Sequence, residues 1–553
     1  MKSLKKITAA AMAVAIAASA TGCSQGKSQL PEINPRRNGD GNYNLLLITV
    51  DQEHYFSEFP EGTNYKARQL LQEMGTTFEK HYACSNMSTS SRSVIYTGTH
   101  ITDTKMLDNT DFDWQGAMSE DLVTIADRMN EAGYYSAYKG KWHMGNASIL
   151  EASENPLTDL SGYGFADWGT DGDYIGKAWE GYEIDPIITA DSVEWLKEKG
   201  MALNREGQSF FLSINMINPH DIMNLTTEEG FVSTKLDLRD PPSNKVYEET
   251  YDVPLPDTWQ DDLSGTVEAV RAYKSRWSNQ TGSVSTEEEY QSLQNYYFNC
   301  IQDNDNTLSL LLTALDNMGL FDNTIIVFTA DHGEMQGSHG LKGKGGFIYE
   351  NNIHVPLIIY HPDYEGGRRV SSVTSHMDLA PTFIDMTALS PEKKAEITEG
   401  LNGHSLMPLL GNPEASVRDG HLFCYEMLSF AAGIIPNENG TTSYNIDNRR
   451  FVRAIVTEQY KFARYFTPKE FNTPLTMEEL LASNDLELYD LKNDPNETNN
   501  LALDMEANWE LILEMNEKLN ALIADEIGVD DGSEFKEMIQ NYLESMNRLD
   551  VSQ

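Results

Sequence analysis

Residues 84–100, CSNMSTSSRSVIYTGTH, gather small hydroxyl side chains around a single cation, Arg92. One of these hydroxyls could be a nucleophile or the precursor of one, with the arginine placed to hold negative charge. The alternative is structural, because Ser and Thr at a helix start accept hydrogen bonds from its free N–H groups. From this segment alone the helix-capping interpretation is favoured, since hydroxyl-rich caps are common.

Acidic and basic side chains follow four apolar segments that have the composition of buried strands. These segments are NLLLITV, YYSAYKG, SFFLSINMINP and TIIVFTA. The residues that come at or after their ends are, in the same order, Asp51, Lys141 with His143, His220, and Asp331 with His332. One acid at a strand end is usually a cap or a turn residue, but four such strand ends indicate a shared site.

Helical patterns such as LVTIADRMNEAG separate these strands, which is typical of an α/β fold. We therefore expect residues 43–410 to form one large, mostly parallel sheet that helices cover on both faces. Beyond that point the segments become shorter and the last ones are acidic and helical. Residues 411–553 are predicted to form a smaller α+β domain.

The bulk composition limits the partners of this chain. Its 553 residues are enough for two domains with well-buried cores. There are 85 acidic and 41 basic residues, so the formal charge is −44. Such a charge disfavours nucleic acid and anionic membrane surfaces as partners. An anionic substrate would need a local cluster of cations, and the sequence gives no oligomeric state.

The N-terminus has the pattern of an export signal. Residues 1–22 carry three lysines, a short apolar run and then small residues directly before Cys23. We interpret this as a bacterial lipoprotein signal, with Cys23 lipidated and residues 23–42 as a flexible tether. The protein would then be periplasmic or cell-surface and membrane-anchored; plain secretion is the alternative. The other cysteines, Cys84, Cys300 and Cys424, match no zinc pattern and no disulfide framework.

In these residues the chain resembles the type I sulfatases of the alkaline phosphatase superfamily, over nearly all of its length after the tether. The family signature is Cys or Ser, any residue, Pro or Ala, any residue, Arg, and a short helix that ends in Thr-Gly. The matching segment is STSSRSVIYTG, in which Ser88 is the modified position and Arg92 its charge partner. It departs from the signature at Ser90, where Pro or Ala is usual. The resemblance implies an alkaline-phosphatase-like fold and hydrolysis of aryl or carbohydrate sulfate monoesters.

The resemblance also implies that Ser88 is oxidised to formylglycine (3-oxoalanine) by a radical maturation enzyme. One hydroxyl of the hydrated aldehyde would attack sulfur, and the other would expel sulfate by re-forming the aldehyde. The remaining hydroxyls of the segment are expected to cap the helix beneath Ser88.

The resemblance also implies roles for the residues at the strand ends. One divalent cation, calcium with magnesium as the alternative, would be held by Asp51, Gln52, Ser88, Asp331 and His332. Many relatives have two consecutive acids where this chain has Asp51 and Gln52, so the site carries less negative charge here.

The Lys-x-His pair would place Lys141 on the sulfate oxygens and His143 as the base that accepts a proton from the diol. His220 and Lys344 would protonate the leaving alcohol. The segment GLKGKGG offers a second lysine, Lys342, which competes with Lys344 for that role.

Two other functions remain open from the sequence. A phosphatase or phosphonate monoester hydrolase of the same superfamily could use the same residues, although no His-x-x-x-His pair near Asp331 supplies the ligands of a two-zinc phosphatase. A catalytically inactive surface-binding lipoprotein is the alternative from another class. The intact set of polar residues argues against loss of activity. Residues 107–116 and the loop around Pro156 are expected to line the substrate pocket.

Overall fold

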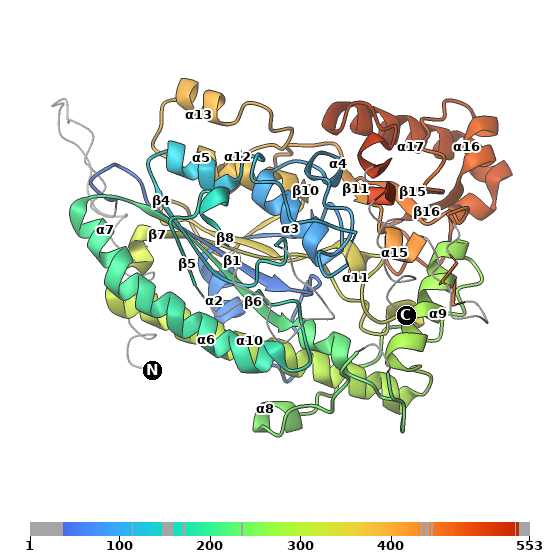
Figure 1. Ribbon diagram of the computed structural model, residues 1–553, viewed down its shortest axis with the longest axis horizontal. Helices are drawn as coiled ribbons and strands as arrows, with labels where there is room; N and C mark the ends of the chain where they lie inside the picture. Colours follow the sequence, from blue (N-terminus) through green and yellow to red (C-terminus); the bar gives the residue numbers. More distant parts are fainter. Residues whose placement is uncertain are drawn as a thin grey trace, which may run out of the picture. The chain divides into compact units, whose positions relative to one another are not determined.

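The core of the fold is an eight-stranded sheet at the centre of the molecule (Figure 1). The computed structural model describes residues 37–112, 114–145, 159–169, 173–233, 236–431, 435–436, 442–443, 446–536 and 538–540. In sheet order the strands are β5 (Asp167–Gly169), β4 (Tyr135–Gly140), β6 (Phe210–Pro219), β1 (Asn44–Asp51), β7 (Thr324–Ala330), β8 (Leu357–Tyr360), β2 (Thr76–Phe78) and β9 (Arg368–Val370).

The four strands that carry the predicted site residues, or end just before them, are neighbours in this sheet. β4 pairs with β6, β6 with β1, and β1 with β7, and all three pairings are parallel. Only β8 runs antiparallel to its partners β7 and β2. Every residue of β1, β6 and β7 is buried, as continuous apolar strands with helices on both faces require. The predicted fold class is confirmed.

Helices cover the two faces of the sheet with separate apolar clusters (Figure 1). On one face lie the long helices α6 (Glu180–Trp195) and α10 (Glu287–Met318), whose Ile188, Leu308 and Leu315 pack with Leu46 and Ile48 of β1. α10 begins with a capping box between Thr286 and Glu289 and ends at Gly319 in the left-handed conformation.

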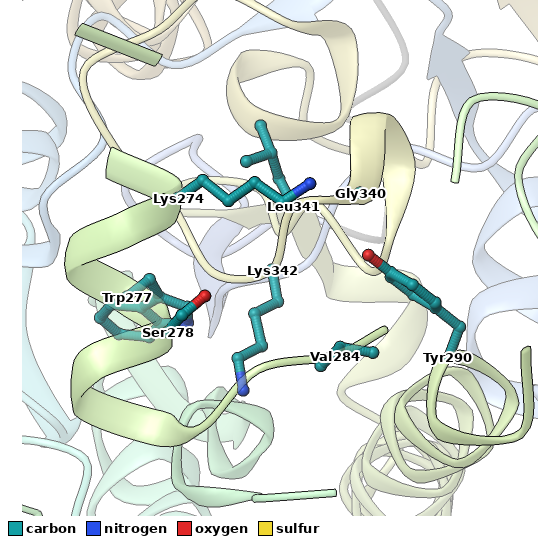
Figure 2. Close-up of a pocket in the computed structure, with 8 residues that line it drawn as sticks. All are labelled: Lys274, Trp277, Ser278, Val284, Tyr290, Gly340, Leu341 and Lys342. Carbon is teal, nitrogen blue, oxygen red and sulfur yellow. The ribbon is translucent and has the colours of Figure 1, made fainter. Parts of the chain in front are cut away.

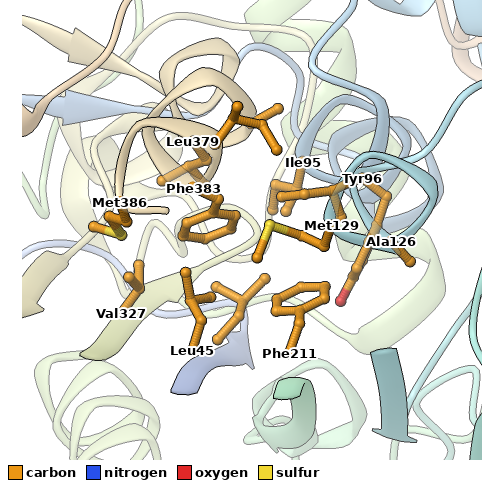
Figure 3. Packing of buried hydrophobic residues seen from close by; sticks show 14 of the residues in the cluster. Leu45, Ile95, Tyr96, Ala126, Met129, Phe211, Val327, Leu379, Phe383 and Met386 are labelled. Carbon is orange, nitrogen blue, oxygen red and sulfur yellow. The ribbon is translucent and has the colours of Figure 1, made fainter. Parts of the chain in front are cut away.

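The opposite face is covered by α3 (Ser88–Thr97), α5 (Ile125–Glu131) and α12 (Leu379–Asp385). Figure 3 shows Leu45 and Phe211 from the sheet in contact with Met129 and Phe383 from these helices. Leu45 and Leu46 thus point to opposite faces, as successive strand residues do. Full burial of such side chains stabilises the fold by about 1.5–3 kcal/mol each. This packing fixes α3, which begins at Ser88, against the sheet.

A second, four-stranded antiparallel sheet forms in the C-terminal part, again as predicted. Its order is β11 (His421–Tyr425), β14 (Phe451–Val456), β15 (Tyr460–Phe466) and β16 (Asp485–Asp490). Helix α17 (Met505–Glu526) covers one face through Ile512 and Leu519. The other face packs Tyr425 and Tyr465 against the segment around Phe347. That contact supports the loop that carries Lys344. The domain boundary near residue 410 stays a prediction.

The remaining elements are short. The helices are α2 (Lys66–Met74), α4 (Ile101–Thr104), α7 (Met201–Glu206), α8 (Lys245–Glu248), α9 (Glu268–Thr281), α11 (Glu350–Ile353), α13 (Pro391–Ile397), α14 (Met407–Gly411), α15 (Leu428–Ala431) and α16 (Met477–Ser483). Two small sheets pair β3 (His81–Tyr82) with β10 (Thr374–Ser375) and β12 (Ile435–Pro436) with β13 (Thr442–Ser443). Of the described helices, none has the length and apolarity to span a bilayer. The predicted signal at 1–22 and Cys23 lie outside the described residues, as does Pro156.

Candidate active site

The predicted residues meet at the carboxyl end of the central sheet. Asp51 ends β1, and Asp331 follows β7 directly. Lys141 follows β4, and its Nζ lies 2.6 Å from Oδ2 of Asp51. His220 follows β6 at the start of a 3-10 turn, His220–Asn224, where it interacts electrostatically with Asp51 and Lys141. Parallel neighbours align their carboxyl ends, which explains why residues far apart in sequence converge here.

Ser88 is the first residue of α3 and lies inside this cluster. Its Oγ is 2.9 Å from Nζ of Lys344 and 2.9 Å from Nε2 of His332. Nζ of Lys344 is also 2.7 Å from the same His332 nitrogen. A hydroxyl held between a lysine and a histidine has both a cation and a proton acceptor in direct contact.

The helix-capping prediction for the neighbouring hydroxyls is wrong. Met87 occupies the N-cap position of α3, and no side chain caps that end. Two of the hydroxyls instead bind carbonyl groups of other segments: Thr89 donates to the carbonyl of His143 at 2.6 Å, and Ser91 donates to the carbonyl of Asp331. They fasten the helix start to the strand-end loops, a contact that a local sequence pattern cannot reveal.

The two lysines of the glycine-rich loop point in different directions. Lys344 reaches Ser88, whereas Lys342 donates to the carbonyl of Thr281 at 3.2 Å. Figure 2 shows Lys342 beside a separate small pocket, with Trp277 and Tyr290 among its lining residues. Tyr273 donates to the carbonyl of Lys344 and helps to fix the loop. Of the two candidates, the structure therefore brings Lys344 into the cluster.

Arg92 joins the acids rather than bonding Ser88 directly. Its Nε donates to Oδ2 of Asp331 at 3.0 Å, and its Nη2 lies 3.3 Å from Oδ2 of Asp51. Its Nη1 donates to the carbonyl of Lys141 at 2.9 Å. The guanidinium thus ties together three of the strand ends, one helical turn from Ser88.

Asp51, Asp331 and His332 present ligand atoms that all lie within 4.8 Å of one another. Oδ1 of Asp51 is buried and accepts no hydrogen bond, which leaves an acceptor that a cation could use. Oε1 of Gln52 faces the same cluster, where it accepts from Lys344 at 3.1 Å. Gln52 has φ 72°, a left-handed backbone that is rare for a glutamine. The donor set, mostly oxygen, fits a hard divalent cation.

The two other histidines lie close to the cluster with free ring nitrogens. Both ring nitrogens of His143 are buried without a hydrogen bond, and Nε2 is 3.7 Å from Oδ1 of Asp111. Nδ1 of His220 also has no hydrogen-bond partner. Gly176 packs directly on the His220 ring, because a Cβ there would lie only 2.0 Å from its Cε1. These nitrogens have the capacity to bond an incoming group.

Burial and neighbouring charges set the protonation of the cluster. Burial alone would raise the pKa of Asp51, but Lys141 and the other nearby cations hold it well below its usual range. Burial and the Asp51 carboxylate raise the pKa of Asp331 to about 6. Burial lowers the pKa of Lys344 to about 8, although both acids oppose this shift. Lys344 therefore stays mostly protonated at neutral pH.

Burial and nearby cations lower the pKa values of the site histidines, which favours their neutral forms. Burial lowers the pKa of His332, and the charge of Lys344 lowers it further. Burial and the charge of Lys141 lower the pKa of His220 and of His143, the latter against the opposing effect of Asp111. Neutral imidazoles can accept protons, and a bound anion beside them would raise their pKa values.

Three acids that sequence analysis did not single out support these groups. Glu334 is fully buried and accepts from Nε2 of Gln52 at 2.5 Å. Asp111 faces His143, and Asp173 accepts from the backbone N–H of His143 at 2.8 Å. Glu334 comes two residues after His332, so its position beside a strand end was a usable signal. Asp111 lies in the segment 107–116 that was expected to line the pocket, whereas Asp173 lies in a loop for which the sequence gives no comparable signal.

Sequence comparisons agree with the geometry. The sequence model of the family described as Sulfatase matches residues 44–389, which is more than half of the chain. A second model, described as N-sulphoglucosamine sulphohydrolase, C-terminal, matches residues 337–525. Both matches include the loop that carries Lys344.

Among curated relatives, Arylsulfatase K of Gallus gallus is 26% identical over 390 residues, 66% of this chain and 66% of the relative, slightly under two thirds of its length. An N-acetylglucosamine-6-O-sulfatase of Bacteroides thetaiotaomicron is 24% identical over 526 residues, 85% of this chain and 84% of the relative. A solved structure described as a complex with its substrate D-glucosamine-2-N,6-O-disulfate has a TM-score of 0.64 at 19% identity, covering 89% of this chain and 99% of its own. That likeness shows the fold.

Proposed function

Because the chain belongs to the sulfatase family, we propose that it hydrolyses sulfate monoesters of aryl or carbohydrate alcohols at residue 88. The observation that carries this proposal is the position of Ser88, whose Oγ lies 2.9 Å from both Lys344 and His332 inside a buried cluster of acids and cations. A sulfate ester is anionic, and Lys141, Lys344 and Arg92 supply local positive charge within this acidic chain.

In this proposal Ser88 is oxidised to formylglycine by a radical maturation enzyme. The hydrated aldehyde supplies one hydroxyl to attack sulfur and a second whose deprotonation expels sulfate. Serine at position 88, with Arg92 four residues later, supports the assignment. The unusual Ser90 makes the extent of conversion a quantity to be measured.

One divalent cation, calcium or magnesium, would be held by Asp51, Gln52, Asp331, His332 and the oxygen of residue 88. The unbonded Oδ1 of Asp51 supports this assignment. When bound, the cation would stabilise negative charge on the reacting oxygens. The protein side chains then have two tasks, to bind the sulfate group and to move protons.

Lys141 is placed to bind sulfate oxygens, since its Nζ makes no hydrogen bond in the described protein beyond its ion pair with Asp51. Lys344, protonated at neutral pH, can donate to the bridging oxygen together with His220. His220 is neutral before binding, so the anion itself must raise its pKa for it to act as an acid. His143, neutral and without a hydrogen bond, can accept the proton that precedes release of sulfate.

The relatives narrow the proposed substrate class. One is named N-acetylglucosamine-6-O-sulfatase, and a structural neighbour is described with a disulfated glucosamine. We therefore propose a sulfated carbohydrate as the natural substrate, with aryl sulfates as convenient activated analogues. The lipoprotein assignment, with a signal at 1–22 and an anchor on Cys23 in the periplasm or at the cell surface, rests on the sequence alone.

The test compares wild-type protein with Ser88→Ala on three ester classes: an aryl sulfate, glucosamine 6-sulfate and an aryl phosphonate monoester. We expect sulfate release by the wild type and none by the variant, since alanine can neither attack nor be oxidised. Preferred turnover of the phosphonate would favour the rival hydrolase of the same superfamily. Equal sulfate release by Ser88→Ala would exclude residue 88 as the nucleophile.

A further inference from the structure

The amide of Gln52 has two ends, and only one can serve a cation. Its oxygen is a possible ligand, whereas its NH2 group would repel a positive ion. In the structure Oε1 faces the cluster and accepts from Lys344 at 3.1 Å. Nε2 points the other way and donates to Oε2 of Glu334 at 2.5 Å. The orientation of this amide is therefore defined by its two hydrogen-bond partners.

Glu334 has no exposed surface, and each of its oxygens has a separate task. Oε1 accepts from the backbone N–H of Gln336 at 3.0 Å and of Gly343 at 2.6 Å, which holds the turn before Lys344. Oε2 accepts from Gln52. A buried carboxylate with both oxygens bonded has no need of a further ligand, so Glu334 acts through its neighbours.

We propose that Glu334 is a positioning residue that forces the oxygen of Gln52 toward the cation site and supplies the negative charge that a second consecutive acid would otherwise carry. This inference rests on the cation site of the proposed function. A flipped Gln52 amide would set its oxygen against the carboxylate of Glu334 and its NH2 group against the ammonium of Lys344. Both contacts would be repulsive in a buried site, so the observed orientation is strongly preferred.

The negative charge of Glu334 also acts on the proposed cation site, although Glu334 is not itself a ligand there. Asp51 and Asp331 face three cations, Arg92, Lys141 and Lys344, before any divalent ion is added. With Glu334 included, the number of acids equals the number of these cations. Without it, a divalent ion would enter a site with an excess of positive charge, and its binding would weaken.

The substitution Glu334→Gln separates the support of the turn before Lys344 from the orientation of Gln52. A glutamine keeps an oxygen for the N–H groups of Gln336 and Gly343, but it places an NH2 group opposite Nε2 of Gln52. Two donors then face each other, and Gln52 must flip or break its contact. The exchange Gln52→Glu with Glu334→Gln restores one donor and one acceptor, keeps the total charge, and leaves a carboxylate oxygen toward the cation.

The experiment measures calcium affinity by calorimetry on protein in which residue 88 is serine, verified by mass, so that turnover plays no part. The variants are wild type, Glu334→Gln, the double exchange, and Glu487→Gln as a matched control. Glu487 is equally buried and accepts from Tyr465 and Tyr489 in the second sheet. Thermal unfolding in chelator measures the purely structural effect of each change.

We expect Glu334→Gln to weaken calcium binding roughly 10- to 100-fold. The double exchange should return to near the wild-type affinity, and Glu487→Gln should leave it unchanged. Unweakened binding by Glu334→Gln, or a double exchange that binds no better than it, overturns the inference. Should Glu334→Gln not fold, the double exchange must still fold and bind; failure of both also overturns it. Absence of calcium and magnesium binding in the wild type would instead contradict the cation of the proposed function, and this inference with it.

Discussion

Two fully buried arginines lie near the end of β1, and each is paired with two acids. Their roles differ. Arg68 binds both oxygens of Glu53 and Oδ1 of Asp305, and its Nη2 donates to Asn304 at 3.0 Å. The second oxygen of Asp305 accepts from the backbone of Ala67. Every carboxylate oxygen of this network is bonded. Nothing is left over for a ligand.

The network of Arg92 differs although its acids are just as buried. Oδ1 of Asp51 accepts no hydrogen bond, and two more cations, Lys141 and Lys344, crowd the same acids. We call the Arg92 network open, because an oxygen of Asp51 is unbonded, and the Arg68 network closed, because all its carboxylate oxygens are bonded. Asp51 of the open network and Glu53 of the closed network are only two residues apart in the sequence. Burial of charge alone therefore does not distinguish the two networks; the unsatisfied oxygen of Asp51 does.

The largest effect on stability is expected for Arg68→Met. It removes the guanidinium and leaves Glu53 and Asp305 buried without their cation. We expect the free energy of unfolding to fall by about 3–5 kcal/mol, while activity per folded molecule is retained. Urea unfolding measures the first quantity and turnover of the folded fraction the second. Arg205→Met, at an exposed arginine of α7, is the control and should change little. An unchanged stability for Arg68→Met would mean that the closed network is not structural.

Arg92→Lys should give the opposite result. Lysine keeps the charge but cannot bridge Asp51 and Asp331 at once, so these two proposed cation ligands are held less well. We expect kcat/KM to fall roughly 100- to 1000-fold with a smaller change in stability than in Arg68→Met. Arg464→Lys, a buried arginine of the second sheet that binds Asn516 and Asn520, is the matched control. The assignment fails if both lysine variants lose activity equally.

Substitutions of His220 and His143 should give different kinetic defects. If His220 helps to protonate the leaving alcohol, His220→Ala should lose roughly 100-fold or more on a sugar sulfate and clearly less on an activated aryl sulfate. If His143 acts at sulfate release, His143→Ala should show one rapid turnover per site and then stall. Rapid-mixing assays on both substrates measure this, with the exposed His404→Ala as control. Equal losses on both substrates and no burst would mean that these acid and base roles are wrong.

The fold and most of the candidate site followed from the sequence for one physical reason. Buried parallel strands are continuous apolar runs, and the sequence shows the polar residue that ends each run, so Asp51 and Asp331 could be placed together. The sequence favoured Lys344 over Lys342 on the motif match alone, because the hydrogen bond from Tyr273 to the Lys344 carbonyl, which helps to fix the glycine-rich loop, is not visible in it. The helix cap was wrong because Thr89 and Ser91 find distant carbonyl partners.

The pairing of Gln52 with Glu334 was also beyond sequence analysis. The two residues are far apart along the chain, and their hydrogen bond depends on the left-handed turn at Gln52. Only the resemblance to the family indicated that a second acid is missing after Asp51. In the proposal above, Glu334 carries the compensating charge.

Whether residue 88 is converted can be read from the mass of the peptide that carries it, taken from protein produced in anaerobically grown cells. The proposed function predicts a peptide lighter than the encoded sequence by two hydrogen atoms, because an alcohol has become an aldehyde. Sulfatase activity should rise in proportion to the converted fraction across preparations, and Ser88→Ala should show neither. Full sulfatase activity in a preparation that contains only unmodified serine at position 88 would contradict the account.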